Sequence, residues 1–355
     1  MFQTSRLQTM FRLVVHGRRP GERRAAYESV NHLTDLHDQV KAHFELDALG
    51  IEVRPPRNIE EERALKILNE SSRLTGGGWQ TSLLWRADAP PLSDKYDSAR
   101  SRLKGIERKI DSDAMLKEAY SAQIRRLIDK GYAVQIERDS VPEQRWFLSH
   151  FAVVNPNKPG KIQLVFDAAA RHNGVSLNDR LLSGPNLLNP LLGILLKFRI
   201  GKVAVTGDIE DMFLRIKIQE RDRRAQLFLW RDDQTKEPQI FVMESIIFSA
   251  TSSPACAIFV LNKNAERYTD EYPEAVAAIK HGHYMDDCIY SVDSPEIARR
   301  LIEDVKRIHG EGNFRIRGRA TNSAELREHL PAADSTNAHK VSLAKTEPHF
   351  EKTLA

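Results

Sequence analysis

The spacing of apolar residues in this chain changes at Gly131. Ahead of that glycine, one helical stripe recurs at intervals of three and four residues through Tyr96, Ala99, Leu103, Ile106 and Ile110. A second helix is expected from about 113 to 130, and Gly131 suits its C-terminal end. Beyond Gly131, segments rich in Val, Ile and aromatic residues predict strands. Helices and strands mixed without regular βαβ alternation favour an α+β fold over a doubly wound one.

Further elements follow from local patterns. Asn58 and Glu61 form a potential capping box ahead of a short helix, and residues 73–91 are expected to be turn-rich. Strands are expected over 132–137, 146–154 and 161–167, with a hairpin turn at 155–160, and later over 203–208, 225–230 and 238–245. Helices are expected near Leu191, over 253–266 and over 294–309.

Length and composition narrow the class of protein. A chain of 355 residues predicts about two domains or one large lobed domain. With 53 Lys and Arg against 49 Asp and Glu, the formal net charge is only +4, which is mildly basic. The apolar stretch 187–200 is interrupted by polar residues, so we expect no transmembrane helix. Two cysteines without zinc-ligand spacing exclude a disulfide scaffold and structural zinc.

Four regions are expected along the chain. Residues 1–30 form an N-terminal arm without fixed structure, 31–130 a helical extension, 131–330 the main region, and 331–355 a polar tail. Arginines without any acid in the first 21 residues also suit a transit peptide, although we favour a solvated arm or the start of a longer coding sequence.

Residues 203–218 contain the first candidate for chemistry. Val203 and Val205 alternate with smaller residues as in a part-buried strand, which delivers Asp208 at its end and Phe213 five residues later. Taken alone, Asp208 is more simply interpreted as a helix cap.

The second candidate is the doublet Asp286–Asp287, which is framed by large apolar residues on both sides. Burying two like charges side by side costs several kcal/mol per ion unless a cation neutralises them. Because adjacent strand residues point to opposite faces, both acids can approach one centre only at a tight turn. A solvated Asp-Asp turn is the alternative, although such turns rarely have so apolar a frame.

Together, the three carboxylates suggest Mg²⁺, which prefers oxygen ligands and completes its coordination with water and substrate phosphates. Two such ions about 3.5 to 4 Å apart stabilise the attacking and leaving oxygens of phosphoryl transfer. The expected reaction is nucleotidyl transfer.

These motifs resemble the palm motifs of retroelement reverse transcriptases. The resemblance rests on Asp-x-x-x-x-Phe at 208–213, on FSATSSPACA at 248–257 and on Tyr-Met-Asp-Asp at 284–287. The surroundings at 43–51, 164–188 and 312–326 resemble the BEL/Pao class of LTR retrotransposon polyproteins, so that about residues 35–330 are covered. The resemblance implies a right-hand palm and fingers, with an antiparallel sheet and packed helices, a helical N-terminal extension and no thumb.

The resemblance also implies roles for individual residues. Asp208 and Asp286 would bridge two Mg²⁺ ions, with Asp287 as third carboxylate and the Ile209 backbone as a further metal contact. The remaining candidates bind the dNTP or the nucleic acid. Those for the nucleotide are Ile209, Glu210, Asp211, Phe213, Ser253 and Pro254, and those for template and primer are Lys158, Lys161, Tyr284 and Met285. Core packing is the alternative for Phe213, and a solvated loop is the alternative for the two lysines.

Two single residues and one pair depart from the family pattern. Gln163 replaces an arginine of the fingers strand, Ser249 replaces a glycine, and Gly318–Arg319 replaces a Lys-Trp pair whose lysine would be a proton donor to pyrophosphate. We therefore expect either an RNA-directed DNA polymerase or a catalytically inactive relic that at most binds RNA or RNA/DNA hybrid. A third alternative is a helical scaffold built from residues 31–130.

Expected partners are an RNA template, a DNA primer, dNTPs and other domains of the polyprotein, but no membrane. The resemblance implies a cytoplasmic retroelement particle, with the nucleus as the other compartment. No Asp-Ser-Gly or Asp-Thr-Gly triplet marks an aspartic protease, and we expect a polyprotein fragment that ends before thumb, RNase H and integrase.

Overall fold

The structure, a computed structural model, describes residues 6–9, 12–15, 58–87, 92–154 and 161–329. The chain divides into two units, Met1–Val53 and Arg54–Ala355. In the first unit, β1 (Arg6–Thr9) pairs antiparallel with β2 (Arg12–Val15), which places a hairpin within the region expected to be an arm. The resembling segment 43–51, the expected turn at 155–160 and the polar tail at 331–355 lie outside the described residues.

The second unit mixes helices with small sheets. Its first half contains α2 (Ile59–Ser71), β3 (Arg73–Thr75), β4 (Gly78–Thr81), α3 (Tyr96–Asp111), α4 (Ala114–Asp129), β5 (Ala133–Ile136), β6 (Ser149–Val154), β7 (Ile162–Asp167) and α5 (Leu191–Phe198). Its second half contains β8 (Val203–Ile209), β9 (Lys217–Ile218), α6 (Glu220–Arg223), β10 (Leu227–Trp230), β11 (Gln239–Met243), α7 (Ser253–Glu266), α8 (Pro273–Gly282), β12 (His283–Tyr284), β13 (Asp287–Val292), α9 (Pro295–Glu311), β14 (Ile316–Thr321) and α10 (Ala324–His329). The fold is therefore α+β, as expected.

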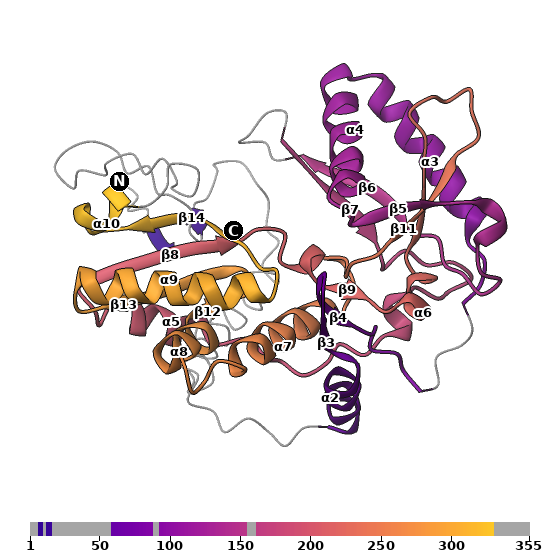
Figure 1. The fold of residues 1–355 in the computed structure, drawn as a ribbon. Coiled ribbons are helices and arrows are strands. Elements are labelled where there is room, and N and C mark those ends of the chain that lie inside the picture. Colours follow the sequence, from indigo (N-terminus) through magenta and orange to yellow (C-terminus); the bar gives the residue numbers. More distant parts are fainter. Residues whose placement is uncertain (1–5, 10–11, 16–57, 88–91, 155–160, 330–355) are drawn as a thin grey trace, which may run out of the picture. The chain divides into compact units, whose positions relative to one another are not determined.

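Four strands in the order β12-β13-β8-β14 form an antiparallel sheet. Figure 1 shows α9 lying along β8 and β13, and α8 also contacts β13. The β8 side chains alternate between buried and half-buried, because one face of the strand packs against this helical layer. Gly207 allows β14 to approach β8, since a Cβ atom at this position would come within 2.7 Å of Cγ2 of Ile316.

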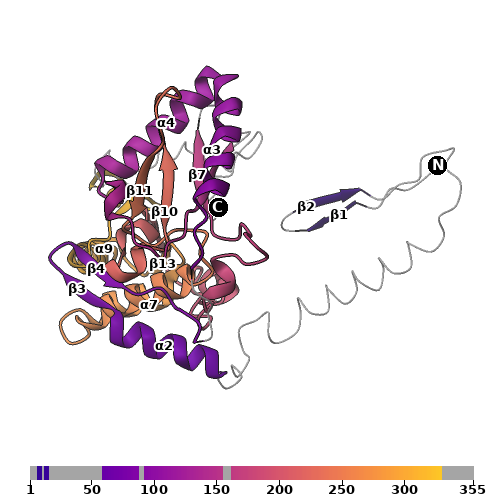
Figure 2. The ribbon, with the colours of Figure 1, turned by 90° about the vertical axis from the view of Figure 1, so that its right-hand side faces the viewer.

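A second antiparallel sheet has the order β10-β11-β5, and β6 and β7 form a separate hairpin. Figure 2 shows α3 and α4 beside these strands. The spacing of apolar residues explains this packing, because Ala99, Leu103 and Ile110 of the predicted stripe are the buried apolar residues of α3. Helix α4 begins at the cap Asp113 and ends before Gly131, whose φ of 65° suits the predicted C-terminal stop.

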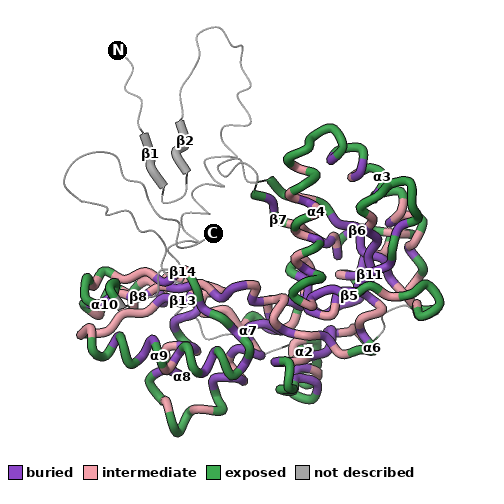
Figure 3. The backbone as a smooth tube through the Cα atoms, turned by 45° about the horizontal axis from the view of Figure 1, so that its top comes forward, coloured by how far each residue is buried: buried purple, intermediate pink, exposed green. Residues whose placement is uncertain are grey.

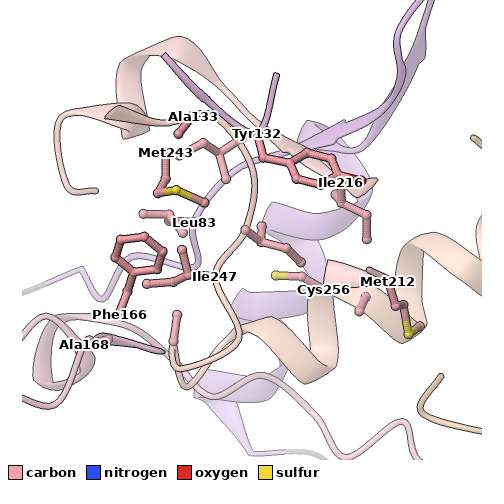
Figure 4. Packing of buried hydrophobic residues seen from close by; sticks show 14 of the residues in the cluster. Leu83, Tyr132, Ala133, Phe166, Ala168, Met212, Ile216, Met243, Ile247 and Cys256 are labelled. Carbon is pink, nitrogen blue, oxygen red and sulfur yellow. The ribbon is translucent and has the colours of Figure 1, made fainter. Parts of the chain in front are cut away.

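One hydrophobic core runs through the second unit, from Leu68 of α2 to Ile316 of β14. Figure 3 shows buried residues along the strands and exposed residues on the outer faces of the helices, and Figure 4 shows part of the cluster. Hydrogen bonds connect distant segments as well: the Trp79 indole donates to Asn264 Oδ1 at 3.0 Å, and the Leu83 amide donates to Asp222 Oδ2 at 2.8 Å. Residues 59–130 thus belong to the same compact unit as residues 131–329.

The segment 73–81 differs from the expected turn-rich stretch. Its glycines form the turn of a hairpin in which Thr75 pairs with Gly78, and Gly78 has a φ of 107° that favours glycine. Strand β4 then pairs with β9 in parallel, which departs from the otherwise antiparallel sheets.

Helix α8 was not expected either.

Among the helices that the structure describes, none combines the length and apolar character that a bilayer crossing requires.

Candidate active site

The structure brings Asp208, Asp286 and Asp287 together. Asp208 lies near the end of β8, directly opposite Asp287 of β13 in the antiparallel register. Asp286 occupies the tight turn between β12 and β13, and its carbonyl accepts a hydrogen bond from the Ile209 amide at 2.8 Å. The preceding residue of the turn, Met285, has a φ of 55°. The doublet therefore lies at the tight turn that the sequence predicted.

The surroundings of Asp208 and Asp287 disfavour their charged forms. Burial and the negative charge of Asp286 together raise the pKa of Asp208 to about 6, although the charge of Arg317 opposes the shift. Burial and the charges of Asp286 and Asp208 raise the pKa of Asp287 to about 7. A carboxylate near a like charge is less stable ionised, and a bound cation would relieve that cost.

The donor set of this acidic trio suits a hard divalent cation, since it offers carboxylate oxygens and no sulfur or nitrogen. Within the described part of the chain, no group of three or more His, Cys, Asp or Glu residues is arranged so that it could hold a metal ion.

Glu210 and Asp211 follow directly and have cationic neighbours. One amino group of Arg126 donates to both carboxylate oxygens of Asp211, at 2.6 Å each, and Lys130 Nζ lies 2.9 Å from Asp211 Oδ2. The Tyr132 hydroxyl donates to the same oxygen at 3.3 Å. Both cations come from α4 and its C-cap, some eighty residues earlier in the chain.

Glu210 is buried and accepts from three cations. Lys130 Nζ lies 3.0 Å from Glu210 Oε1, Arg317 Nη1 lies 3.1 Å from the same atom, and Arg215 Nη2 lies 3.0 Å from Oε2. Arg317 of β14 also approaches Asp208, with Nε 3.9 Å from Oδ2, because the register places the two residues opposite each other. Arg317 thus connects the acidic trio to this ion cluster, which consists of Arg126, Lys130, Glu210, Asp211, Arg215 and Arg317.

The cations reverse the effect of burial on these two acids. Burial raises the pKa of Asp211, but hydrogen bonds from Arg126 and Lys130 outweigh it and hold the pKa below its usual value. Burial likewise raises the pKa of Glu210, and the hydrogen bond from Lys130 with the charge of Arg317 brings it below the usual value. Both side chains are therefore negatively charged near neutral pH.

The backbone expected to face a triphosphate is partly engaged. The Ile209 amide donates to Asp286 as described, and the Glu210 amide donates to the Arg315 carbonyl at 2.9 Å. The Asp211 backbone has a φ of 55°, so the chain turns away from the sheet after β8. In this conformation, neither of the first two amides is offered to a ligand.

Phe213 lies half-buried just beyond this turn. Its ring packs edge-on against Phe248, with centroids 5.3 Å apart and planes at 87°. Phe248 is 62% exposed, although large aromatic rings are usually buried. The pair places an accessible aromatic surface beside the segment that follows Asp208.

Ser253 and Pro254 open α7 as expected. The Ser253 hydroxyl is buried and donates to the Ile247 carbonyl at 2.6 Å, so it fastens the start of the helix. Ser249 also has a local role, because its hydroxyl donates to the Phe166 carbonyl of β7.

The candidate nucleic-acid contacts lie in different places. Tyr284 and Met285 are half-buried in the hairpin beside Asp286. Lys161 is exposed just before β7, on a hairpin separate from the sheet that carries Asp208, and Lys158 lies outside the described residues. Gln163 is exposed on β7, opposite Val153.

Sequence reasoning missed Arg126, Lys130, Arg317 and Phe248. The two α4 cations are spaced i, i+4 among other charged residues, a pattern shared by any solvated helix face. Phe248 begins the FSATSSPACA segment and could have been found there.

No protein-family model and no curated protein matches this chain.

Proposed function

We propose that this chain is the reverse transcriptase region of a BEL/Pao-type retrotransposon polyprotein, an RNA-directed DNA polymerase. The observation that carries the proposal is the register of β8 and β13, which pairs Asp208 with Asp287 and places Asp286 at the adjoining turn. Acids more than seventy residues apart in sequence are thus neighbours in the sheet, in the order that the resemblance implies.

The fold supports the same proposal. In the proposed polymerase, the four-stranded antiparallel sheet with α8 and α9 would be the palm, and the β6–β7 hairpin with the β10-β11-β5 sheet would be the fingers. Two departures from the family pattern are accommodated: Ser249 bonds to the Phe166 carbonyl, and Gly318, with a φ of 62°, lies where the register of β14 shifts. Neither removes an acid of the trio.

In the proposed reaction, the primer 3′-oxygen forms a bond to the α-phosphorus of a dNTP, the bond from that phosphorus to the bridging oxygen breaks, and pyrophosphate leaves. Asp208, Asp286 and Asp287 would hold the two Mg²⁺ ions. Bound Mg²⁺ supplies charge stabilisation for the attacking and leaving oxygens. Phe213 would lie beneath the sugar and reject a 2′-hydroxyl by steric contact. RNA template and DNA primer would be held mainly through their backbones.

Primer extension on poly-rA/oligo-dT with dTTP and Mg²⁺ tests the proposal. The wild-type chain should extend the primer and Asp286→Asn should not. Asp293→Asn is the matched control, because Asp293 is an exposed acid just after the other end of β13. Extension no greater than that of Asp286→Asn would leave only the inactive relic, whose remaining property would be binding of RNA or RNA/DNA hybrid.

Phe213→Ala tests the role of the ring. The variant should incorporate ribonucleotides about 10- to 100-fold more readily relative to deoxynucleotides, which is the range for losing one steric contact. The ratio of kcat/KM for dTTP and UTP measures it. Phe151→Ala, which removes another partly exposed phenylalanine, should leave the ratio unchanged.

A further inference from the structure

The ion cluster beside Asp208 contains more cations than acids. Arg126, Lys130, Arg215 and Arg317 surround the carboxylates of Glu210 and Asp211. Two positive charges are therefore in excess within these six side chains, whereas the adjoining Asp208, Asp286 and Asp287 carry up to three negative charges. Because like charges held together repel one another, such a cluster favours binding of an additional anion.

Arg126 and Lys130 are exposed enough to exchange partners. Each side chain is 34% exposed, whereas their partner Asp211 is 11% exposed. They lie one helical turn apart at the end of α4, where the Lys130 amide donates to the Arg126 carbonyl at 3.1 Å. The spacing presents a guanidinium and an ammonium group on one side of the helix.

The position of these cations matches a requirement of the proposed reaction. A nucleotide whose α-phosphate lies at Asp208 must place its other phosphates nearby, and Gln163 cannot hold a phosphate as an arginine does. Nη2 of Arg126 already donates to both oxygens of a carboxylate, and a guanidinium also donates charge-assisted hydrogen bonds to phosphate oxygens.

We infer that Arg126 and Lys130 bind the triphosphate of the incoming nucleotide, with Asp211 occupying them until the nucleotide displaces it. The inference rests on the proposed function and names the phosphate-binding residues of that same site. Asp211 holds the two side chains in a fixed arrangement, so the substrate need not order them. Asp211 also competes with the triphosphate, because its carboxylate must be displaced before the phosphates can bind.

Equilibrium binding of inorganic tripolyphosphate without Mg²⁺, measured by calorimetry, tests the inference independently of catalysis. Arg126→Gln should weaken binding about tenfold or more, the value of a lost charge-assisted hydrogen bond. Arg125→Gln is the matched control, because this neighbouring arginine is 53% exposed and pairs with Glu118. Asp211→Asn should strengthen binding severalfold by removing the competitor.

Two results would overturn the inference. One is equal binding by the Arg126→Gln and Arg125→Gln variants, and the other is an Asp211→Asn variant that loses binding as Arg126→Gln does, as expected of a purely structural ion cluster. Thermal melting checks that each variant is folded. If Arg126→Gln does not fold, Arg126→Lys replaces it: it keeps the charge but not the bidentate geometry, and should bind tripolyphosphate more weakly than wild type. Unchanged binding by Arg126→Lys would then count against the inference.

Primer extension separates this inference from the proposed function. If both hold, Arg126→Gln should raise the KM for dTTP about tenfold and leave the KM for template-primer unchanged. Extension by wild type with an unchanged KM for dTTP in Arg126→Gln would refute the inference alone. Tripolyphosphate binding that depends on Arg126, without any extension, would refute the polymerase proposal and keep the anion site.

Discussion

Asp208 and Asp211 lie three residues apart on one segment, yet their surroundings affect a negative charge in opposite ways. The pKa of Asp208 is raised to about 6 by burial and by Asp286, whereas hydrogen bonds from Arg126 and Lys130 lower the pKa of Asp211 in spite of its burial. The β12–β13 hairpin places acids beside Asp208, whereas α4 and its C-cap place cations beside Asp211. The difference shows that the partner element decides whether the pKa of a half-buried aspartate is raised or lowered.

The largest expected effect is the loss of primer extension when Asp208 is replaced. Asp208→Asn should reduce primer extension on the order of 10³-fold, as when a group that stabilises transition-state charge is removed. Its folded state should be at least as stable as wild type, because neutral Asn relieves the repulsion from Asp286. Extension assays and thermal melts on the same preparation measure both. Loss of activity through unfolding would contradict the comparison.

Glu210→Gln should show the reverse, with a loss of stability. Glu210 is buried and pairs with Lys130, Arg215 and Arg317, so its neutralisation removes the acidic partner of Arg215 and one of the two acidic partners of each of the other cations. We expect the free energy of unfolding to fall by about 3 kcal/mol. Denaturant titration measures it, with Glu274→Gln as the control, since that exposed pair with Arg300 should contribute only about 0.5 kcal/mol. Equal losses of unfolding free energy in Glu210→Gln and Glu274→Gln would show that the ion pairs of Glu210 contribute no more than an exposed pair.

The pH dependence of stability should distinguish Asp287 from the paired acids. Its folded pKa of about 7 lies above the ordinary value of 3.8, so its ionised form destabilises the folded state. The penalty is absent below about pH 4, grows between pH 4 and 7, and is complete at pH 8. Asp287→Asn should therefore gain about 2 kcal/mol over wild type at pH 8, after allowance for solvent screening, and nothing at pH 4.

For Glu210 and Asp211 the sign is opposite. Their pKa values are lowered, so the stability they contribute is present above their ordinary values and is lost as the pH falls through the folded ones. Urea titrations at pH 4 and pH 8 would reveal both signs, and a gain by Asp287→Asn that is the same at both pH values would contradict the assignment.

The smallest expected effect concerns Mg²⁺. At a few times its Kd, Mg²⁺ should raise the stability of wild type by about 1 kcal/mol, because it binds only the folded acidic trio. Asp208→Asn should show a smaller shift, and Arg126→Gln should respond as wild type does. Thermal melts without nucleotide measure this, and a shift that survives in Asp208→Asn would place the ion elsewhere.

Much of the fold was predictable because its elements rest on local signals. The capping box of Asn58 and Glu61 is present in both directions, and α7 has the expected bounds. The hairpin that bears Asp286 and Asp287 was predicted from the apolar residues around the doublet. Helix α8 was missed, and the hairpin β3–β4 appeared as turns because each strand has only three or four residues.

The charge environment of the site could not be predicted, since it depends on tertiary pairing. Nothing in the sequence near Arg126 indicates Asp211, which lies 85 positions later. Arg317 faces Asp208 only in the register that β14 has before its shift at Gly318. Asp286 and Asp287 could be predicted because their neighbours in sequence are unusual. Arg126 and Arg317 could be identified only from the folded structure.

The position of Arg317 beside Asp208 and Glu210 depends on the glycine at position 207. A methyl group there would come within 2.7 Å of Cγ2 of Ile316, so the Ile316 side chain or β14 would have to shift. If β14 shifts, Arg317 moves with it. Asp208 then loses its ion pair with Arg317 and keeps only acidic neighbours, and Glu210 loses one hydrogen-bond donor. The absence of a side chain at position 207 therefore lets β14 lie close enough to β8 for Arg317 to face Asp208 and Glu210.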